Sequence, residues 1–297
     1  MEQQRIVGVH GIRQGGTSQR QLHKDWSRAL DRGIRAFHVG TSAPASALTP
    51  ILDVPHWSPL LARGVDRLGP SDGMSDESVP LTGDEEAFLV EAFDDLLRSE
   101  DVAWAEQQDL PTLGPPKMWP ASLTRRVIAY DRRAPEGAGR KLVTFLREVR
   151  YYLTNPTLAD RVRTRVLEAF SDTTTVVIAH SLGSVIAYDL IRHQQLAAPG
   201  TVGARLHTFV TCGSPLAIPA IRRAMTIPDR DLLATPPGIR WVNVHDPDDV
   251  ITGAAGLALG ARNVIDAEVD NGNTDPHAAE KYLRTIPVAR AATNSWS

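Results

Sequence analysis

Apolar and polar positions alternate along the chain in blocks that predict strands and helices in turn. Short β-branched runs that end at turn residues predict strands at 5–10, 51–57, 174–180, 206–213, 240–245 and 263–269. Apolar residues at helical spacing predict helices at 17–37, 84–98, 121–130, 138–153, 157–170, 184–196, 217–225 and 276–284. The regular strand–helix alternation after residue 174 predicts an α/β fold, with a mostly parallel central sheet and helices on both faces.

Residues 58–120 differ in composition from the rest of the chain. They are dense in proline, glycine, serine and acidic residues, with the predicted helix 84–98 among them. We interpret them as an irregular and partly helical insertion in a single domain of residues 1–297, and as a possible lid over a binding pocket. Large side chains in this segment and directly before it could line such a pocket or close a small core of their own: Trp57, Met74, Phe88, Phe93, Trp104, Met118 and Trp119.

The composition narrows the classes of partner and compartment. The 297 residues carry a formal net charge of -3, which predicts no general attraction to nucleic acid or to anionic membranes. Cys212 is the single cysteine, so an internal disulfide is excluded, and no Cys/His spacing suggests a metal site or another cofactor. The N-terminus shows no signal peptide, and no run approaches the roughly 20 apolar residues of a membrane span. These features predict a soluble, cytoplasmic protein and leave its oligomeric state open.

One segment carries the pattern of an activated serine. A buried strand runs into Ala179-His180-Ser181-Leu182-Gly183, and a helix follows at once. This context is typical of a nucleophile elbow, whose sharp turn needs small residues two positions before and after the serine. The alternative is that Ser181 only caps the helix. The literal Gly-x-Ser-x-Gly string at 69–73 contains a proline and follows no strand, so we reject Ser71.

The acid and base are expected downstream of the serine, in that order. Asp246, Asp248 and Asp249 follow the predicted strand 240–245, and His277 is the single histidine after them. We predict Ser181 as nucleophile, His277 as general base and Asp249 as the acid that orients the imidazole. Asp249 is preferred because two apolar residues follow it directly and can re-enter the core. Asp248 is the second choice, and the alternative for His277 is a polar residue in a helix first turn.

The tetrahedral intermediate of acyl transfer needs backbone N–H donors, which form an oxyanion hole. We predict these donors at Leu182, directly after the serine, and at Ile12, in the glycine-rich loop after the first strand. Arg13 and His180 are possible substrate contacts. A surface ion pair is the alternative for Arg13.

Several of these segments together resemble the lipase and serine-esterase branch of the α/β-hydrolases. The similar stretches are VHG after the first strand, AHSLGS, TCGSPL, WVNVHDPDDV and HAAEKYL. They cover both ends of the chain and residues from about 140 onward, and leave 58–120 unmatched. The resemblance implies hydrolysis of a small-molecule acyl ester through an acyl-enzyme on Ser181. Ala179 departs from the usual glycine, and the chain begins at the oxyanion strand, so the first two strands of that fold are expected to be missing.

Three other interpretations stay open at this stage. The same triad serves thioesterases, acyltransferases and peptidases or amidases. A hydrolase fold can also be used as a non-catalytic binding module. Gly11 and Gly16, followed by Thr17-Ser18, are similar to a nucleotide phosphate loop, but the lysine that such loops carry is absent.

Overall fold

The computed structural model describes most of the chain. It covers residues 4–12, 14, 16–40, 50–62, 80–108, 119–196, 198, 200–227, 231–253 and 255–294. Arg13, Ser71, Met74 and Met118 lie outside these residues, so the predictions that concern them are not addressed by the structure.

Six strands form one all-parallel sheet in the order β2-β1-β3-β4-β5-β6. The strands are β1 Arg5–Val9, β2 Ile51–Asp53, β3 Thr174–His180, β4 Thr208–Cys212, β5 Arg240–His245 and β6 Val264–Glu268. The α/β class and the parallel sheet predicted from the sequence are thereby confirmed. β2 is shorter than the predicted strand 51–57. Pro55, which cannot donate a backbone hydrogen bond to a ladder, stands just beyond its end.

Eleven α-helices occur among the described residues. They are α1 Gln19–Gly40, α2 Ser58–Ala62, α3 Gly83–Leu96, α4 Ser99–Glu106, α5 Ala121–Asp131, α6 Ala138–Thr154, α7 Pro156–Leu167, α8 Leu182–Arg192, α9 Pro219–Ala224, α10 Ala279–Leu283 and α11 Ile286–Ala292. The short helices α2, α4 and α11 were not predicted, because five to eight residues span too few turns to show a helical period.

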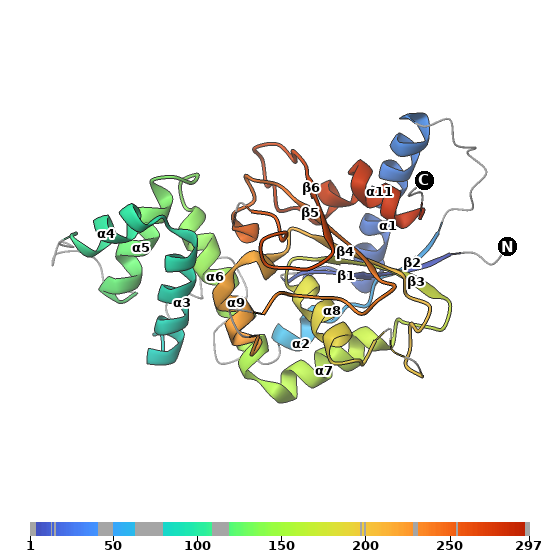
Figure 1. The fold of residues 1–297 in the computed structure, drawn as a ribbon, viewed down its shortest axis with the longest axis horizontal. Coiled ribbons are helices and arrows are strands. Elements are labelled where there is room, and N and C mark those ends of the chain that lie inside the picture. The colour runs from blue at the N-terminus through green and yellow to red at the C-terminus, as the bar shows by residue number, and fades with distance from the viewer. Residues whose placement is uncertain are drawn as a thin grey trace. The chain divides into compact units, whose positions relative to one another are not determined.

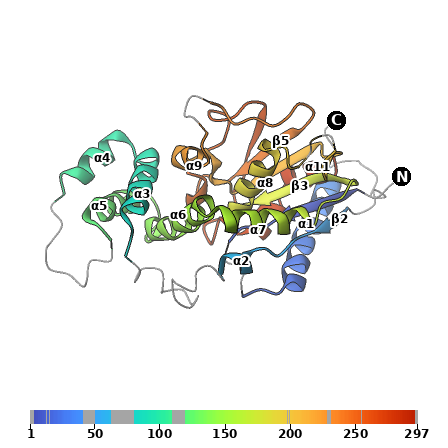
Figure 2. The ribbon, with the colours of Figure 1, turned by 90° about the horizontal axis from the view of Figure 1, so that it is seen from below.

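Helices cover both faces of the sheet. α1, α10 and α11 pack on one face, where Trp26, Phe37 and Val288 join alternate strand residues such as Ile178 and Val210 in one core. α7 and α8 lie on the opposite side, below the strands in Figure 1, and Figure 2 looks at the molecule from that side. No helix among the described residues is long and apolar enough to cross a membrane.

The chain divides into two compact units. The first contains the sheet and consists of residues 1–60, 159–217 and 230–297; the second consists of residues 61–158 and 218–229. Within the second unit, Arg147 pairs with Glu85 at 2.7 Å and Arg126 with Asp94 at 2.6 Å, which ties α6 and α5 to α3. Most of the predicted insertion 58–120 falls in this unit, and its role as a lid stays a prediction.

Candidate active site

The order of the strands identifies where a site can form in the first unit. The chain runs from β1 to β2 on one side and then crosses to β3 on the other, so the order reverses between β1 and β3. Open parallel sheets bind ligands at such a reversal, beyond the carboxyl ends of the strands. The loops after β1 and β3 meet there, and those after β4, β5 and β6 leave the same edge.

Ser181 stands on a sharp turn between β3 and α8. Its φ of 56° and ψ of -131° lie in a region that side-chain-bearing residues rarely occupy. The turn also requires glycine two residues later, because a Cβ on Gly183 would collide with the carbonyl oxygens of Val9 and His10. The serine is therefore held in a strained backbone conformation at the head of a buried helix.

The structure brings Ser181, His277 and Asp249 into one hydrogen-bonded chain. The Oγ of Ser181 lies 2.9 Å from Nε2 of His277, and Nδ1 of His277 lies 2.7 Å from Oδ2 of Asp249. A carboxylate only accepts, which assigns the imidazole proton to Nδ1 and leaves Nε2 to accept from the serine hydroxyl. The serine hydroxyl therefore faces a base that is held in the tautomer suited to remove its proton.

Asp249 is fully buried and nevertheless held in its charged form. Its Oδ2 also accepts from the Tyr282 hydroxyl at 2.8 Å, and its Oδ1 accepts from the Ile251 N–H at 3.0 Å. Burial alone would raise the pKa of Asp249, but the electrostatic interaction with His277 and these hydrogen bonds outweigh it and lower the pKa below its usual value. The carboxylate is thus available to stabilise a positive charge on His277.

Asp248 and Asp246 occupy different positions from Asp249. Asp248 is exposed, and its backbone N–H donates to Oδ1 of Asp246 at 2.8 Å. Asp246 is buried, and its Oδ2 accepts from the Asn271 N–H at 2.6 Å. Asp246 therefore links the loop after β5 to the loop that leads to His277.

Tyr282 is a site residue that the sequence analysis missed. Its ring is fully buried, and its hydroxyl accepts from the Asp246 N–H at 3.2 Å while donating to Asp249. Burial, followed by the Asp249 carboxylate, raises the pKa of Tyr282, so the hydroxyl keeps its proton as a donor. The available signal was its position in α10, five residues after His277, but this spacing does not reveal a partner in the loop after β5.

The two predicted oxyanion segments lie beside Ser181. A Cβ on Gly11 would stand 2.7 Å from Cβ of Ser181, so the loop after β1 touches the serine directly. Leu182 is the first residue of α8, and within the described part of the chain no acceptor takes its N–H. Ile12 follows Gly11, and the assignment of both N–H groups as oxyanion donors stays a prediction.

His180 is buried next to the serine and bonds to the histidine loop. Its Nε2 lies 2.8 Å from the carbonyl oxygen of His277, so Nε2 carries the proton, and the two rings lie 4.6 Å apart. Burial, and then the electrostatic interaction with His277, lowers the pKa of His180 to about 3. A neutral ring therefore faces the histidine of the proposed triad; its predicted role as a substrate contact is not tested.

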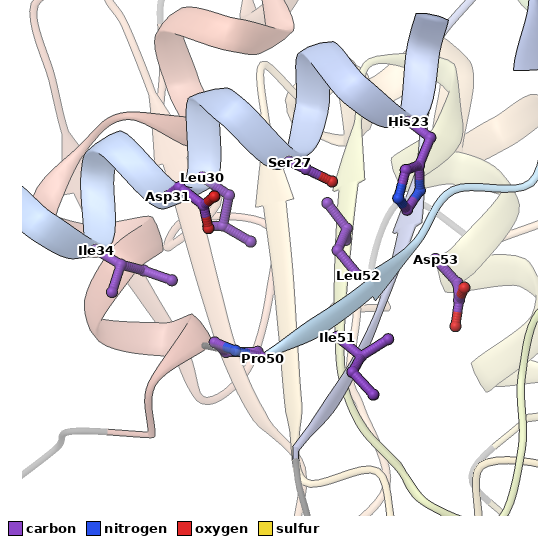
Figure 3. Close-up of a pocket in the computed structure, with 9 residues that line it drawn as sticks. All are labelled: His23, Ser27, Leu30, Asp31, Ile34, Pro50, Ile51, Leu52 and Asp53. Carbon is purple, nitrogen blue, oxygen red and sulfur yellow. The ribbon is translucent and has the colours of Figure 1, made fainter. Parts of the chain in front are cut away.

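A separate hollow of about 380 Å³ lies between α1 and β2, with His23, Ser27 and Asp53 on its walls (Figure 3). None of the triad residues lines it. Asp53 is paired with Arg5 at 2.6 Å. Among the described residues, His, Cys, Asp and Glu side chains do not gather in threes as a metal site would require.

Comparisons of the chain with models of protein families, with curated proteins and with solved structures found no match.

Proposed function

We propose that the chain is a serine hydrolase with an α/β-hydrolase fold that cleaves carboxylic esters through an acyl-enzyme. The observation that carries the proposal is the chain of hydrogen bonds from the Ser181 hydroxyl through His277 to buried Asp249. The position of this chain at the strand-order reversal supports the proposal, as does the strained turn at Ser181.

In the proposed reaction, Oγ of Ser181 attacks the ester carbonyl carbon while Nε2 of His277 takes the hydroxyl proton. The N–H groups of Ile12 and Leu182 stabilise the oxyanion. His277 then donates its proton to the leaving alcohol as the carbonyl reforms, which gives the acyl-enzyme. Water attacks this intermediate with His277 again as base and releases the acid, while Asp249 holds the ring and offsets its positive charge.

The same groups would serve thioesters or amides, so the ester preference rests on the resemblance to lipases and esterases. A nucleotide-binding function has less support. Gly11 packs against Ser181, so the loop after β1 is used by the proposed hydrolase site.

Labelling with a fluorophosphonate tests the proposal directly. An activated serine forms a covalent phosphonyl adduct, so we expect mass spectrometry to locate one adduct on Ser181 of the folded wild type. The wild type should also hydrolyse p-nitrophenyl esters of short or medium chain length. Ser181→Ala should lose the adduct and lower kcat by about 10⁴-fold or more.

Ser27→Ala is the matched control, because Ser27 lines the hollow between α1 and β2 and lies outside the proposed triad. This variant should keep wild-type labelling and rate. Loss of activity in Ser27→Ala with full activity in Ser181→Ala would move the site to that hollow. A folded wild type that neither labels nor cleaves any ester would support the non-catalytic binding module instead.

A further inference from the structure

His56 and Trp57, which follow β2, make polar contacts with the loop that follows β1. The Trp57 indole Nε1–H donates to the carbonyl oxygen of His10 at 3.1 Å, and the Trp57 backbone N–H donates to Nε2 of His10 at 3.2 Å. The two rings stack with centroids 4.8 Å apart and planes 6° from parallel. His56, the residue before Trp57, contacts the loop after β1 as well, because its Nε2 lies 2.9 Å from the carbonyl oxygen of Gln14.

The partners of His10 assign its protons. Nε2 faces an N–H donor, so it carries the lone pair, and Nδ1 lies 2.6 Å from the Gly11 carbonyl oxygen, so it carries the hydrogen. Only the neutral ring can make both bonds at once. Burial is the main influence on this ring and lowers the pKa of His10 to about 3, which keeps the ring neutral over the working pH range.

These bonds fix the direction of two successive peptide groups. In a planar trans peptide the N–H points away from the carbonyl. The Trp57 indole holds the carbonyl of His10, which orients the Gly11 N–H, and the His10 ring holds the carbonyl of Gly11, which orients the Ile12 N–H. Gly11 itself lies against Cβ of Ser181.

We propose that His10 and Trp57 are positioning residues that lock the Gly11–Ile12 peptide with its N–H toward the oxyanion of the reaction at Ser181. This inference rests on the proposed function. Without the two side chains the peptide could rotate, and its carbonyl could then turn toward the place where the oxyanion forms. Loss of this N–H donor would raise the free energy of the transition state, which carries the oxyanion charge. We therefore expect kcat to fall while KM changes little.

The test compares a p-nitrophenyl ester with its thionoester, whose sulfur accepts hydrogen bonds weakly. His10→Leu should lower kcat for the ester about 10²- to 10³-fold, the usual effect of losing one oxyanion donor, with KM nearly unchanged. The thionoester rate should fall far less. His10→Asn, which can keep a donor at the Nδ1 position, should recover most of the rate. Trp57→Phe keeps an aromatic ring and should lower kcat for the ester about tenfold. The thionoester rate should again fall far less.

Trp241→Phe is the matched control. Trp241 is equally buried, and its indole N–H donates to Oγ1 of Thr211 at 3.0 Å within the sheet. This variant should lose a similar hydrogen bond without changing either rate. Parallel loss on both substrates in His10→Leu and Trp57→Phe, or no loss in either, would overturn the positioning role while the wild type stays an active serine hydrolase. A wild type that takes no fluorophosphonate label and cleaves neither substrate would overturn the proposed function, and this inference with it.

Discussion

At the scale of single residues, the site depends on opposing influences on one carboxylate. Burial alone disfavours the charge of Asp249, and hydrogen bonds from His277, Tyr282 and the Ile251 N–H restore it. Asp248, one residue earlier, is exposed. Two neighbouring aspartates with the same chemistry therefore have different environments, which allows a matched comparison.

Replacing each aspartate by asparagine tests which one orients the base. Asp249→Asn removes the charge that holds the Nδ1–H tautomer of His277, so kcat for p-nitrophenyl esters should fall about 10³- to 10⁴-fold. Asp248→Asn should stay within about twofold of the wild type, since surface substitutions change little. Steady-state kinetics of both variants decide the matter. A larger loss in Asp248→Asn would exclude Asp249 as the orienting acid.

Residues of the site differ in how much the sequence reveals about them. Ser181 could be predicted from its strand–helix context, and His277 because a single histidine follows the acidic strand end. Tyr282 could not, because its partner Asp249 lies 33 residues away with no shared motif. His10 and Trp57 are 47 residues apart, and their contact depends on β1 pairing with β2. Periodicity describes local structure, whereas these contacts are products of sheet topology.

At the scale of elements, the approach of α8 to the sheet sets the position of the serine. Gly183 lies so close to the carbonyl oxygens at the end of β1 that no side chain fits between them. The sequence predicted both elements and the small residue at 183. It did not predict that β1 would be the contacting strand, because strand order is not encoded in local patterns.

Gly183→Ala should therefore be strongly destabilising. The new methyl group would push α8 away from β1, and overpacking of this kind costs about 1–3 kcal/mol or more. Urea unfolding followed by circular dichroism would measure the loss. Gly16→Ala is the matched control in the same unit, because a Cβ there meets nothing within 4 Å and the residue has no positive φ. Equal stability of the two variants would show that the close contact does not constrain the fold.

At the scale of the whole molecule, two buried histidines couple folding of the first unit to pH. His10 and His180 flank the serine from different strand ends, and burial lowers the pKa of each to about 3, from the usual value of 6.5. A proton on Nε2 of His10 would break the bond that this atom accepts from the Trp57 N–H, whereas a proton on His180 would place a positive charge in a buried site. The active-site edge of the sheet is thus expected to be the acid-sensitive part of the fold.

The sign of this pH effect follows from proton counting. Between about pH 6.5 and 3 the unfolded chain binds more protons than the folded chain at these two histidines, so the free energy of unfolding falls as the pH falls. At pH 5 each histidine should lower the free energy of unfolding by about 2 kcal/mol relative to pH 7.5. Asp249, whose pKa is lowered, loses its contribution only as the pH falls below its usual value of 3.8, which is below both pH values compared here. Urea unfolding at the two pH values measures the difference, and His10→Asn, which removes one titrating ring, should reduce it by about half. Equal stability of the wild type at both pH values would mean that the two rings are not held neutral by burial.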